Sequence, residues 1–184
     1  MVVCLYLLIT LLGILSYAIG IGKMLKNKYA PSTFSRIIWF LLAINSFAGV
    51  LLSNSSSASI LLAGILLLGN MGICVVSFFK GTRGIGRLEY ICSMLLVLSA
   101  IVWLVSDAPL VNLLISLLAH FIGAAPTYKK VWHQPESEDI GFWLLFFLAS
   151  LLSIFVSDAS TLKAVIFPIY YMLFARVALS RERF

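Results

Sequence analysis

Seven apolar segments, each long enough to cross a bilayer, alternate with short polar connections along this chain of 184 residues. A transmembrane helix needs about 20 mostly apolar residues, with a range of about 17–25. The segments cover approximately residues 2–22, 36–52, 59–79, 88–105, 110–125, 140–156 and 162–179. Hydrophobic residues make up 62% of the chain and charged residues only 11%, which is more apolar surface than a small soluble core buries. We therefore expect an all-α integral membrane protein with seven transmembrane helices in a lipid bilayer.

The positive charges predict how these helices are oriented. Every one of the 13 Lys and Arg residues except Lys163 lies in or beside the first, third or fifth connection, or near the C-terminus. Short loops rich in Lys and Arg stay in the cytoplasm. We therefore expect an outside N-terminus and a cytoplasmic C-terminus, in a plasma or inner membrane. The net charge of +6 then reflects this orientation, and the sequence predicts no nucleic-acid partner.

The residue types that carry most enzyme and metal chemistry are sparse. Cys4, Cys74 and Cys92 all lie inside apolar segments, and no Cys-x-x-Cys spacing occurs. No set of a nucleophile, a base and an orienting group is visible. The sequence therefore predicts no enzyme, no metal site and no cofactor.

An internal repeat organises the segments. A shift of 104 residues maps the first two segments onto the fifth and sixth, so that Lys26 meets Lys130, Pro31 meets Pro135 and Trp39 meets Trp143. A shift of 101 then maps the third segment onto the seventh. We therefore expect two three-helix repeats, residues 1–80 and 109–184, joined by a linker helix in residues 81–108. Because one span lies between them, the repeats run parallel, related by an axis along the membrane normal.

This 3+1+3 plan resembles the SWEET and PQ-loop superfamily of membrane transporters. The clearest local match is the run from Gly123 through Pro126-Thr127 to Lys130, followed by Pro135-Glu136-Ser137-Glu138, which is similar to the family's Pro-Gln or Pro-Thr signature. The first copy departs from the signature, since Gly22 and Lys23 stand at the matching positions. The resemblance implies a small polar solute, sugar-like, moved by alternating access.

Polar residues inside the spans are the candidates for a solute site, because burying them in a bilayer is costly. Asn70 lies near the middle of the third segment, and the repeat pairs it with Tyr171, beside Tyr170. The resemblance implies that Asn70 and Tyr171 face each other across a central cavity. Alternatively, Asn70 bonds a neighbouring helix, with Gly69 allowing close approach. Asn45 in the second segment is another candidate of the same kind.

His120 is the one ionisable group deep in a segment, and it is a further candidate for the solute site. Its side chain titrates near neutral pH, so it could relay a proton. Equally, it could be a neutral histidine bonded to a serine or to a backbone carbonyl.

Prolines and glycines mark the expected gating positions. Pro126 removes a backbone donor near the cytoplasmic end of the fifth segment, with Gly123 close by. The resemblance implies a hinge at Pro126, whereas the simpler interpretation is a proline that ends the helix. Gly22 is the counterpart of Pro126 in the first repeat, and Pro168 bends the seventh segment.

The leading hypothesis is facilitated diffusion of a sugar or a similar polar solute. Two alternatives stay open: a non-transporting receptor or scaffold with the same plan, and a proton-coupled carrier of amino acids or vitamins. The sequence is compatible with an oligomer but does not predict one.

The charge distribution makes a direct prediction about topology. A fluorescent reporter that matures only in the cytoplasm, fused after Phe184, should give signal, because Arg176, Arg181 and Arg183 hold this end inside. Whole-cell fluorescence measures the outcome, with a reporter active only in the periplasm as the control. A folded fusion that is dark in the first case and active in the second would contradict the seven-span topology.

Overall fold

The computed structural model describes residues 2–28, 30–53, 55–83, 86–106, 108–133, 140–157, 166–170 and 173, with the backbone alone at 88–89, 103, 106 and 123–133. In this part of the chain there are six long helices and a further helical segment at residues 166–170. The helices are α1 Val2–Leu25, α2 Thr33–Leu52, α3 Ser57–Lys80, α4 Arg87–Ser106, α5 Pro109–His133 and α6 Ile140–Val156. The predicted all-helical class is confirmed, and the predicted seventh span lies mostly outside the described residues.

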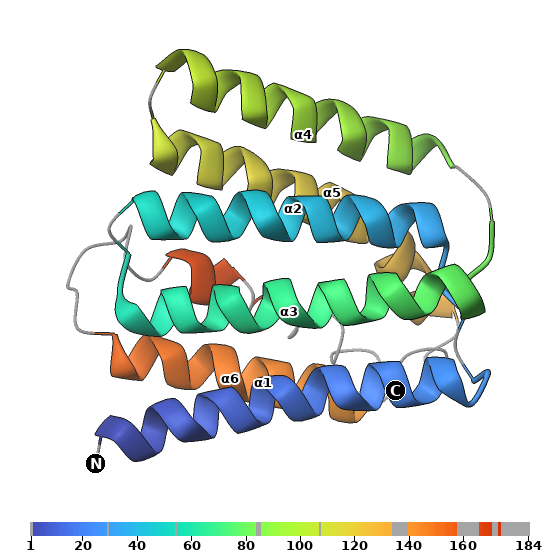
Figure 1. Ribbon diagram of the computed structural model, residues 1–184, viewed down its shortest axis with the longest axis horizontal. Coiled ribbons are helices and arrows are strands. Elements are labelled where there is room, and N and C mark those ends of the chain that lie inside the picture. Colours follow the sequence, from blue (N-terminus) through green and yellow to red (C-terminus); the bar gives the residue numbers. More distant parts are fainter. Residues whose placement is uncertain are drawn as a thin grey trace.

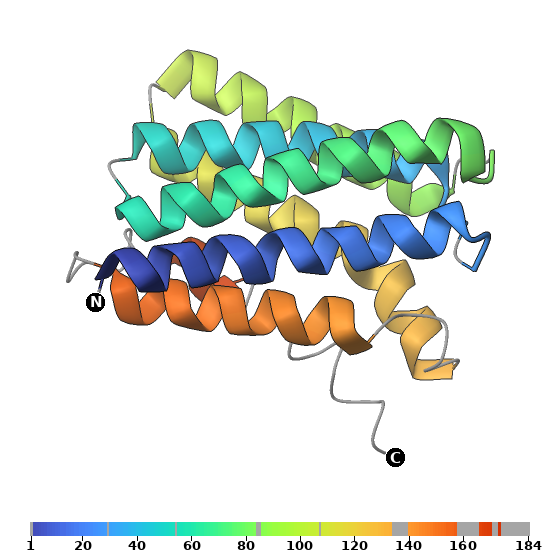
Figure 2. The same ribbon diagram turned by 60° about the horizontal axis from the view of Figure 1, so that its bottom comes forward.

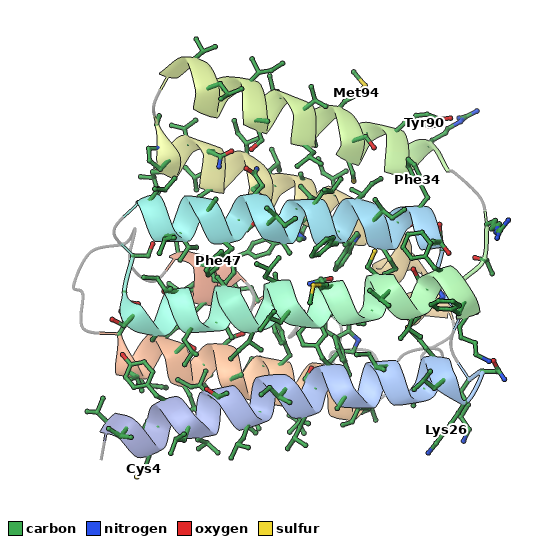
Figure 3. The ribbon with its side chains drawn as sticks, viewed as in Figure 1. Cys4, Lys26, Phe34, Phe47, Tyr90 and Met94 are labelled. Carbon is green, nitrogen blue, oxygen red and sulfur yellow. The ribbon has the colours of Figure 1, made fainter. Side chains whose placement is uncertain are left out.

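Three of the helices, α1, α2 and α3, are long and apolar enough to cross a membrane. Apolar side chains also cover much of the outer surface, and Leu104, Phe79 and Phe155 are 85%, 82% and 77% exposed. Figure 3 shows Met94 on α4 and Cys4 on α1 pointing away from the bundle. A soluble protein rarely exposes apolar surface on this scale. Lipid is the solvent that suits this surface, as expected for a membrane protein.

Successive helices reverse direction, so their connections gather at two ends of the bundle (Figure 1). The α1–α2 and α3–α4 connections lie at the same end, which we call the basic end because it carries Lys26, Lys28 and Arg83. The N-terminus of α1 lies at the opposite end (Figures 1 and 2). Lys26, labelled in Figure 3, marks the basic end. The gathering of these cations at one end agrees with the alternation that the loop charges predict.

From one edge of the bundle to the other, α1 and α6 come first, followed by α3, α2, α5 and α4 (Figures 1 and 2). The middle helix, α3, packs against both α1 and α2, so it lies between them. On the other side of α2 lie α4 and α5, which also pack against each other, while α6 packs against α1 and α3. The α2–α5 and α1–α6 contacts therefore join the early part of the chain to the late part.

Serine side chains begin two of these helices. The hydroxyl of Ser32 accepts a bond from the Ser35 amide at 3.4 Å before α2, and Ser56 accepts one from the Ser59 amide at 3.2 Å before α3. Serine is favoured at this position because its side chain satisfies an N–H group that has no partner within the helix. Ser56 therefore caps α3 in the short polar connection that follows α2.

The α1–α2 connection is bound to the end of α3 at the basic end. The hydroxyl of Thr33 donates to the Ser77 carbonyl at 2.8 Å, and the Thr33 and Thr82 amides donate to the Thr82 and Pro31 carbonyls, each at 2.9 Å. Gly81 lies at this junction, where an added Cβ would stand 2.5 Å from the Thr33 hydroxyl oxygen. The three helices of residues 2–80 are thus held together at this end by backbone bonds as well as by side-chain packing.

The fifth helix is longer than we expected, since α5 continues from Pro109 through Gly123 and Pro126 to His133. Pro126 therefore does not end the helix, and that alternative was wrong. A proline inside a helix removes one backbone bond and pushes against the preceding turn, which kinks a helix without necessarily stopping it. A hinge at Pro126 stays a prediction.

Glycines let α1 and α3 approach closely. An added Cβ at Gly69 would overlap the ring of Tyr17, one at Gly13 would stand 2.6 Å from Cγ2 of Ile65, and one at Gly72 would stand 2.9 Å from Cδ1 of Ile21. Small residues at helix contacts are a common way to bring backbones together in membranes, where packing rather than water drives association. The ring of Tyr17 therefore lies directly on the backbone of α3.

This contact can be tested with two glycines of the same helix. Gly69→Ala should lower stability by about 1–3 kcal/mol, because the methyl group overlaps a buried ring. Gly64→Ala is the matched control, since its methyl group would only touch Phe47 at 3.6 Å and alanine favours helix by about 1 kcal/mol. Unfolding in detergent, followed by circular dichroism, measures both. A Gly69 variant as stable as the Gly64 variant would show that the ring is not packed on α3.

Candidate functional site

Asn70 is buried in the middle of α3, where its side chain is 4% exposed. Its amide nitrogen Nδ2 donates to the Tyr17 hydroxyl of α1 at 3.1 Å and to the Leu66 carbonyl of its own helix at 2.9 Å. Because a carbonyl only accepts, the Leu66 bond identifies which end of the amide is the nitrogen. The carbonyl oxygen Oδ1 of Asn70 is therefore the end not used in these bonds.

Tyr17 connects this amide to the sixth helix. Its ring meets Phe142 and Phe146 of α6 edge to face, with centroids 5.6 Å and 6.0 Å apart. Edge-to-face pairs at these distances are favourable beyond the area that they bury. We call Asn70, Tyr17, Phe142 and Phe146 the Asn70 cluster, in which α1, α3 and α6 meet.

The Asn70 cluster retains hydrogen-bonding capacity. Among the bonds between described residues, Oδ1 of Asn70 accepts none, and the Tyr17 hydroxyl accepts one bond but donates none. An amide carbonyl is a strong acceptor, and a phenol hydrogen is a donor that rotates to suit its partner. An acceptor and a donor thus lie side by side among aromatic rings. This pair suits a neutral hydroxyl or amide group of a solute, because neither the amide oxygen nor the phenol hydroxyl carries a charge.

The other predicted members of this site are only partly described. Tyr171 lies outside the described residues, so its expected position opposite Asn70 stays a prediction. Tyr170 lies in the helical segment 166–170 and packs against the core cluster that contains Tyr17 and Phe146. Pro168 is fully buried in the same segment. The structure therefore places Tyr170 on the core that surrounds Asn70, without a described bond between the two.

A second polar group is buried between α2, α4 and α5, where it involves Asn45. Its Nδ2 donates to the Ser99 hydroxyl of α4 at 2.6 Å, and its Oδ1 accepts from Nδ2 of Asn112 of α5 at 3.0 Å. The Ser99 hydroxyl in turn donates to Oδ1 of Asn112 at 2.5 Å. The three side chains form a closed ring, and each is 7% exposed or less. Both ends of the Asn45 amide are used in this ring, which supports a structural role for Asn45.

Two further serines extend these bonds by one turn. The hydroxyls of Ser46 on α2 and Ser116 on α5 lie 2.7 Å apart, and Ser116 also donates to the Leu42 carbonyl at 3.3 Å. The backbones are close here, because an added Cβ at Gly49 would stand 3.2 Å from Cα of Leu113. We call Asn45, Ser46, Ser99, Asn112 and Ser116 the polar seam. It bonds α2 to both α4 and α5.

His120 lies one turn beyond the polar seam and is 1% exposed. Its ring stands edge to face against Trp39 of α2, with centroids 5.7 Å apart, and lies beside the backbone of Leu42. The guanidinium of Arg36 lies 5.5 Å from the centre of the same Trp39 ring, within the range of a cation–π contact. His120 thus packs from α5 against α2, whereas the Asn70 cluster lies on α1, α3 and α6. Its roles in solute binding and proton relay stay predictions.

Sequence reasoning found Asn70, Asn45 and His120 but missed their partners. Asn112, Ser116 and His120 are spaced four residues apart, which places them on one face of a helix. That face is directed at α2, so the spacing of polar residues in an apolar helix was the available signal. Tyr17 and Ser99 had no such signal, because a single tyrosine or serine in an apolar segment is common.

The predicted gating residues lie on three separate helical segments, and no contact between them is seen among the described residues. Gly22 lies in α1, where an added Cβ would meet nothing within 4 Å. Gly123 and Pro126 lie within α5, and Pro168 lies in the segment 166–170. Gating at these residues stays a prediction.

Within the described residues, no three His, Cys, Asp or Glu side chains are close enough together to hold a metal ion. Cys4 is exposed, Cys74 and Cys92 are buried, and none of these three described cysteines forms a disulfide. Comparisons of the chain with protein families, with curated proteins and with solved structures give no match.

The polar seam makes a prediction that separates bonds between helices from bonds within one helix. Ser99→Ala should lower stability by about 1–3 kcal/mol, because it leaves the buried amides of Asn45 and Asn112 without their shared partner. Ser150→Ala is the matched control, since this buried hydroxyl donates only to the Phe146 carbonyl of its own helix. The control should change stability by less than about 0.5 kcal/mol.

Unfolding of both serine variants in the same detergent, followed by circular dichroism, measures this difference. Equal losses for the two variants would contradict the role of the ring in joining the helices.

Proposed function

We propose that the protein is a small-solute carrier that works by alternating access. Its two three-helix repeats would be parallel and joined by α4, as in the SWEET and PQ-loop proteins that the sequence resembles. The helix contacts support this arrangement. If the repeat exchanges α1 with α5 and α2 with α6, the α1–α6 contact becomes the α5–α2 contact, and both of these contacts are present. Such an exchange is what a twofold relation between repeats requires.

The directions of the helices support the parallel form of the repeat. Both α1 and α5 run towards the basic end, and both α2 and α6 run away from it (Figure 1). Repeats related by an axis along the membrane normal keep these directions, whereas inverted repeats would reverse them. In a carrier of this kind the solute site lies near the midplane, where the two repeats meet.

The observation that carries the proposal is the acceptor and the donor of the Asn70 cluster that no described residue uses. Asn70 is near the middle of α3, and its partner Tyr17 contacts α6 from the proposed second repeat. The pair could bind one hydroxyl of a solute while the rings of Phe142 and Phe146 pack against its apolar face. This chemistry favours a neutral, hydroxyl-rich solute such as a sugar. Because the cluster holds no charged side chain, we propose facilitated diffusion rather than ion-coupled transport.

A receptor or scaffold is the second candidate, and the polar seam is the observation that favours it. The seam engages both ends of the Asn45 amide in bonds between helices, and the bond from Asn70 to Tyr17 is of the same kind. If Asn70 serves only to hold α1 against α3, the protein has no need to move. The third hypothesis, a proton-coupled amino-acid or vitamin carrier, would depend on His120.

Uptake into proteoliposomes distinguishes these candidates. Purified protein is reconstituted, and a panel of labelled neutral sugars, nucleosides and amino acids is supplied with and without a pH gradient. The carrier proposal expects saturable uptake of a neutral solute that a pH gradient does not accelerate. Acceleration by the gradient would favour the proton-coupled carrier, and no uptake across the panel would favour the receptor or scaffold.

Substitutions in the Asn70 cluster should reduce uptake while the protein stays folded. Asn70→Ala and Tyr17→Phe each remove one hydrogen-bonding group, which we expect to lower uptake about three- to tenfold. Each should also lower stability by about 0.6 kcal/mol, the average for a bond between membrane helices. Tyr171→Phe tests the predicted residue of the last segment in the same assay, and we expect reduced uptake.

Tyr6→Phe is the matched control for these variants, because it removes a phenol hydroxyl from the same helix, outside the cluster. It should leave uptake unchanged. If Asn70→Ala and Tyr17→Phe both transport at the wild-type rate, the solute site lies elsewhere.

A further inference from the structure

The two contacts that join the early and late helices are built from different side chains. In the α2–α5 contact, amides and hydroxyls bond across the interface, and α4 is included through Ser99. In the α1–α6 contact, Tyr17 meets the edges of Phe142 and Phe146, and Ser16 donates to the Phe142 carbonyl at 2.9 Å. The first contact therefore contains several side-chain hydrogen bonds between helices, whereas the second contains mainly aromatic contacts and the one bond from Ser16.

The backbones of α2 and α5 also approach each other more closely at Gly49 than those of α1 and α6 do at Gly20. An added Cβ at Gly49 on α2 would stand 3.0 Å from Cβ of Leu113 and 3.2 Å from its Cα, so the α5 backbone itself is close. At the α1–α6 contact, the three atoms nearest to an added Cβ at Gly20 would all belong to side chains, namely the ring of Phe142 from 3.4 Å and Cδ1 of Ile73 at 3.8 Å. A ring can turn away from its neighbour, whereas a backbone moves only with its helix. The α2–α5 contact therefore has less freedom.

In a membrane, the two contacts differ in the free energy needed to separate their helices. Separating α2 from α5 would leave the buried amides of Asn45 and Asn112 without partners in an apolar surrounding, which is costly. Separating α1 from α6 would expose mainly aromatic rings and small side chains, which lipid covers as readily as protein does. Opening the bundle along α1–α6 is thus easier than opening it along α2–α5.

We propose that the polar seam holds α2, α4 and α5 together as one body, and that conformational change opens the α1–α6 contact. The proposed motion is therefore asymmetric, although the two contacts correspond under the repeat. The linker helix α4 belongs to the moving body that contains α2 and α5. The inference does not depend on transport, since a receptor that changes conformation would open in the same place.

Distances between spin labels test this inference without any solute. In a background with Cys4, Cys74 and Cys92 replaced by alanine, cysteine pairs are introduced at exposed positions. One pair joins α1 to α6, Leu15→Cys with Leu144→Cys, and the other joins α2 to α5, Ile44→Cys with Leu118→Cys. Pulsed electron paramagnetic resonance in lipid nanodiscs then gives the distance distribution of each pair.

We expect the α1–α6 distribution to be at least twice as broad as the α2–α5 distribution, or to have two maxima. Equal widths, or a broader α2–α5 distribution, would overturn the proposal. Because no uptake is measured, this result is independent of whether the protein proves to be a carrier.

A second measurement tests whether the polar bonds are the cause. Ser46→Ala with Ser116→Ala removes the paired hydroxyls at 2.7 Å and should broaden the α2–α5 distribution at least 1.5-fold, while the α1–α6 distribution stays unchanged. Ser153→Ala is the control, because its hydroxyl donates only to the Ala149 carbonyl within α6. An α2–α5 distribution that is the same in the double variant and in the control would overturn the role of the polar seam.

Discussion

Buried amides and several buried hydroxyls of this apolar bundle bond to neighbouring helices, and these bonds restrict how the late helices pack against the early ones. Asn45, Ser99 and Asn112 satisfy one another in a closed ring that includes α2, α4 and α5. An unpaired amide at such a place would cost on the order of 1–3 kcal/mol, so a shift of any one helix is penalised. Apolar contacts alone would tolerate many more registers, because one aliphatic surface fits another with little preference.

The same requirement has a different result at Asn70. There the amide nitrogen is satisfied by Tyr17 and Leu66, but the carbonyl oxygen accepts no bond from a described residue. The two amides thus differ in how they are bonded. Both ends of the Asn45 amide bond to other helices, whereas Asn70 uses its nitrogen and its Oδ1 accepts no bond from a described residue. This contrast is why we propose Asn70 for the solute site and a structural role for Asn45.

The sequence allowed several features of the site to be predicted, each from a local signal. The position of Asn70 near the middle of a long apolar segment indicated a buried amide, and Gly69 beside it indicated a close helix neighbour, which the structure identifies as Tyr17. The partners of Asn45 could not be predicted, because Ser99 lies 54 residues away and Asn112 lies 67 residues away in the chain. The continuation of α5 beyond Pro126 was also missed, because a proline can either kink a helix or end it, and the choice depends on the structure around it.

By itself the sequence determined the helical class, the approximate limits of the first six helices except the C-terminal end of α5, and their alternating directions. These features depend on the length of each apolar segment and on the polar residues between segments, both of which are local. Only the tertiary structure decided which helices are neighbours and which polar groups bond to each other. Asn45 and Asn70 look alike in the sequence, since each is one amide in an apolar segment. They differ because hydrogen bonds between helices depend on the distance and angle between two atoms, and those are set when the helices pack.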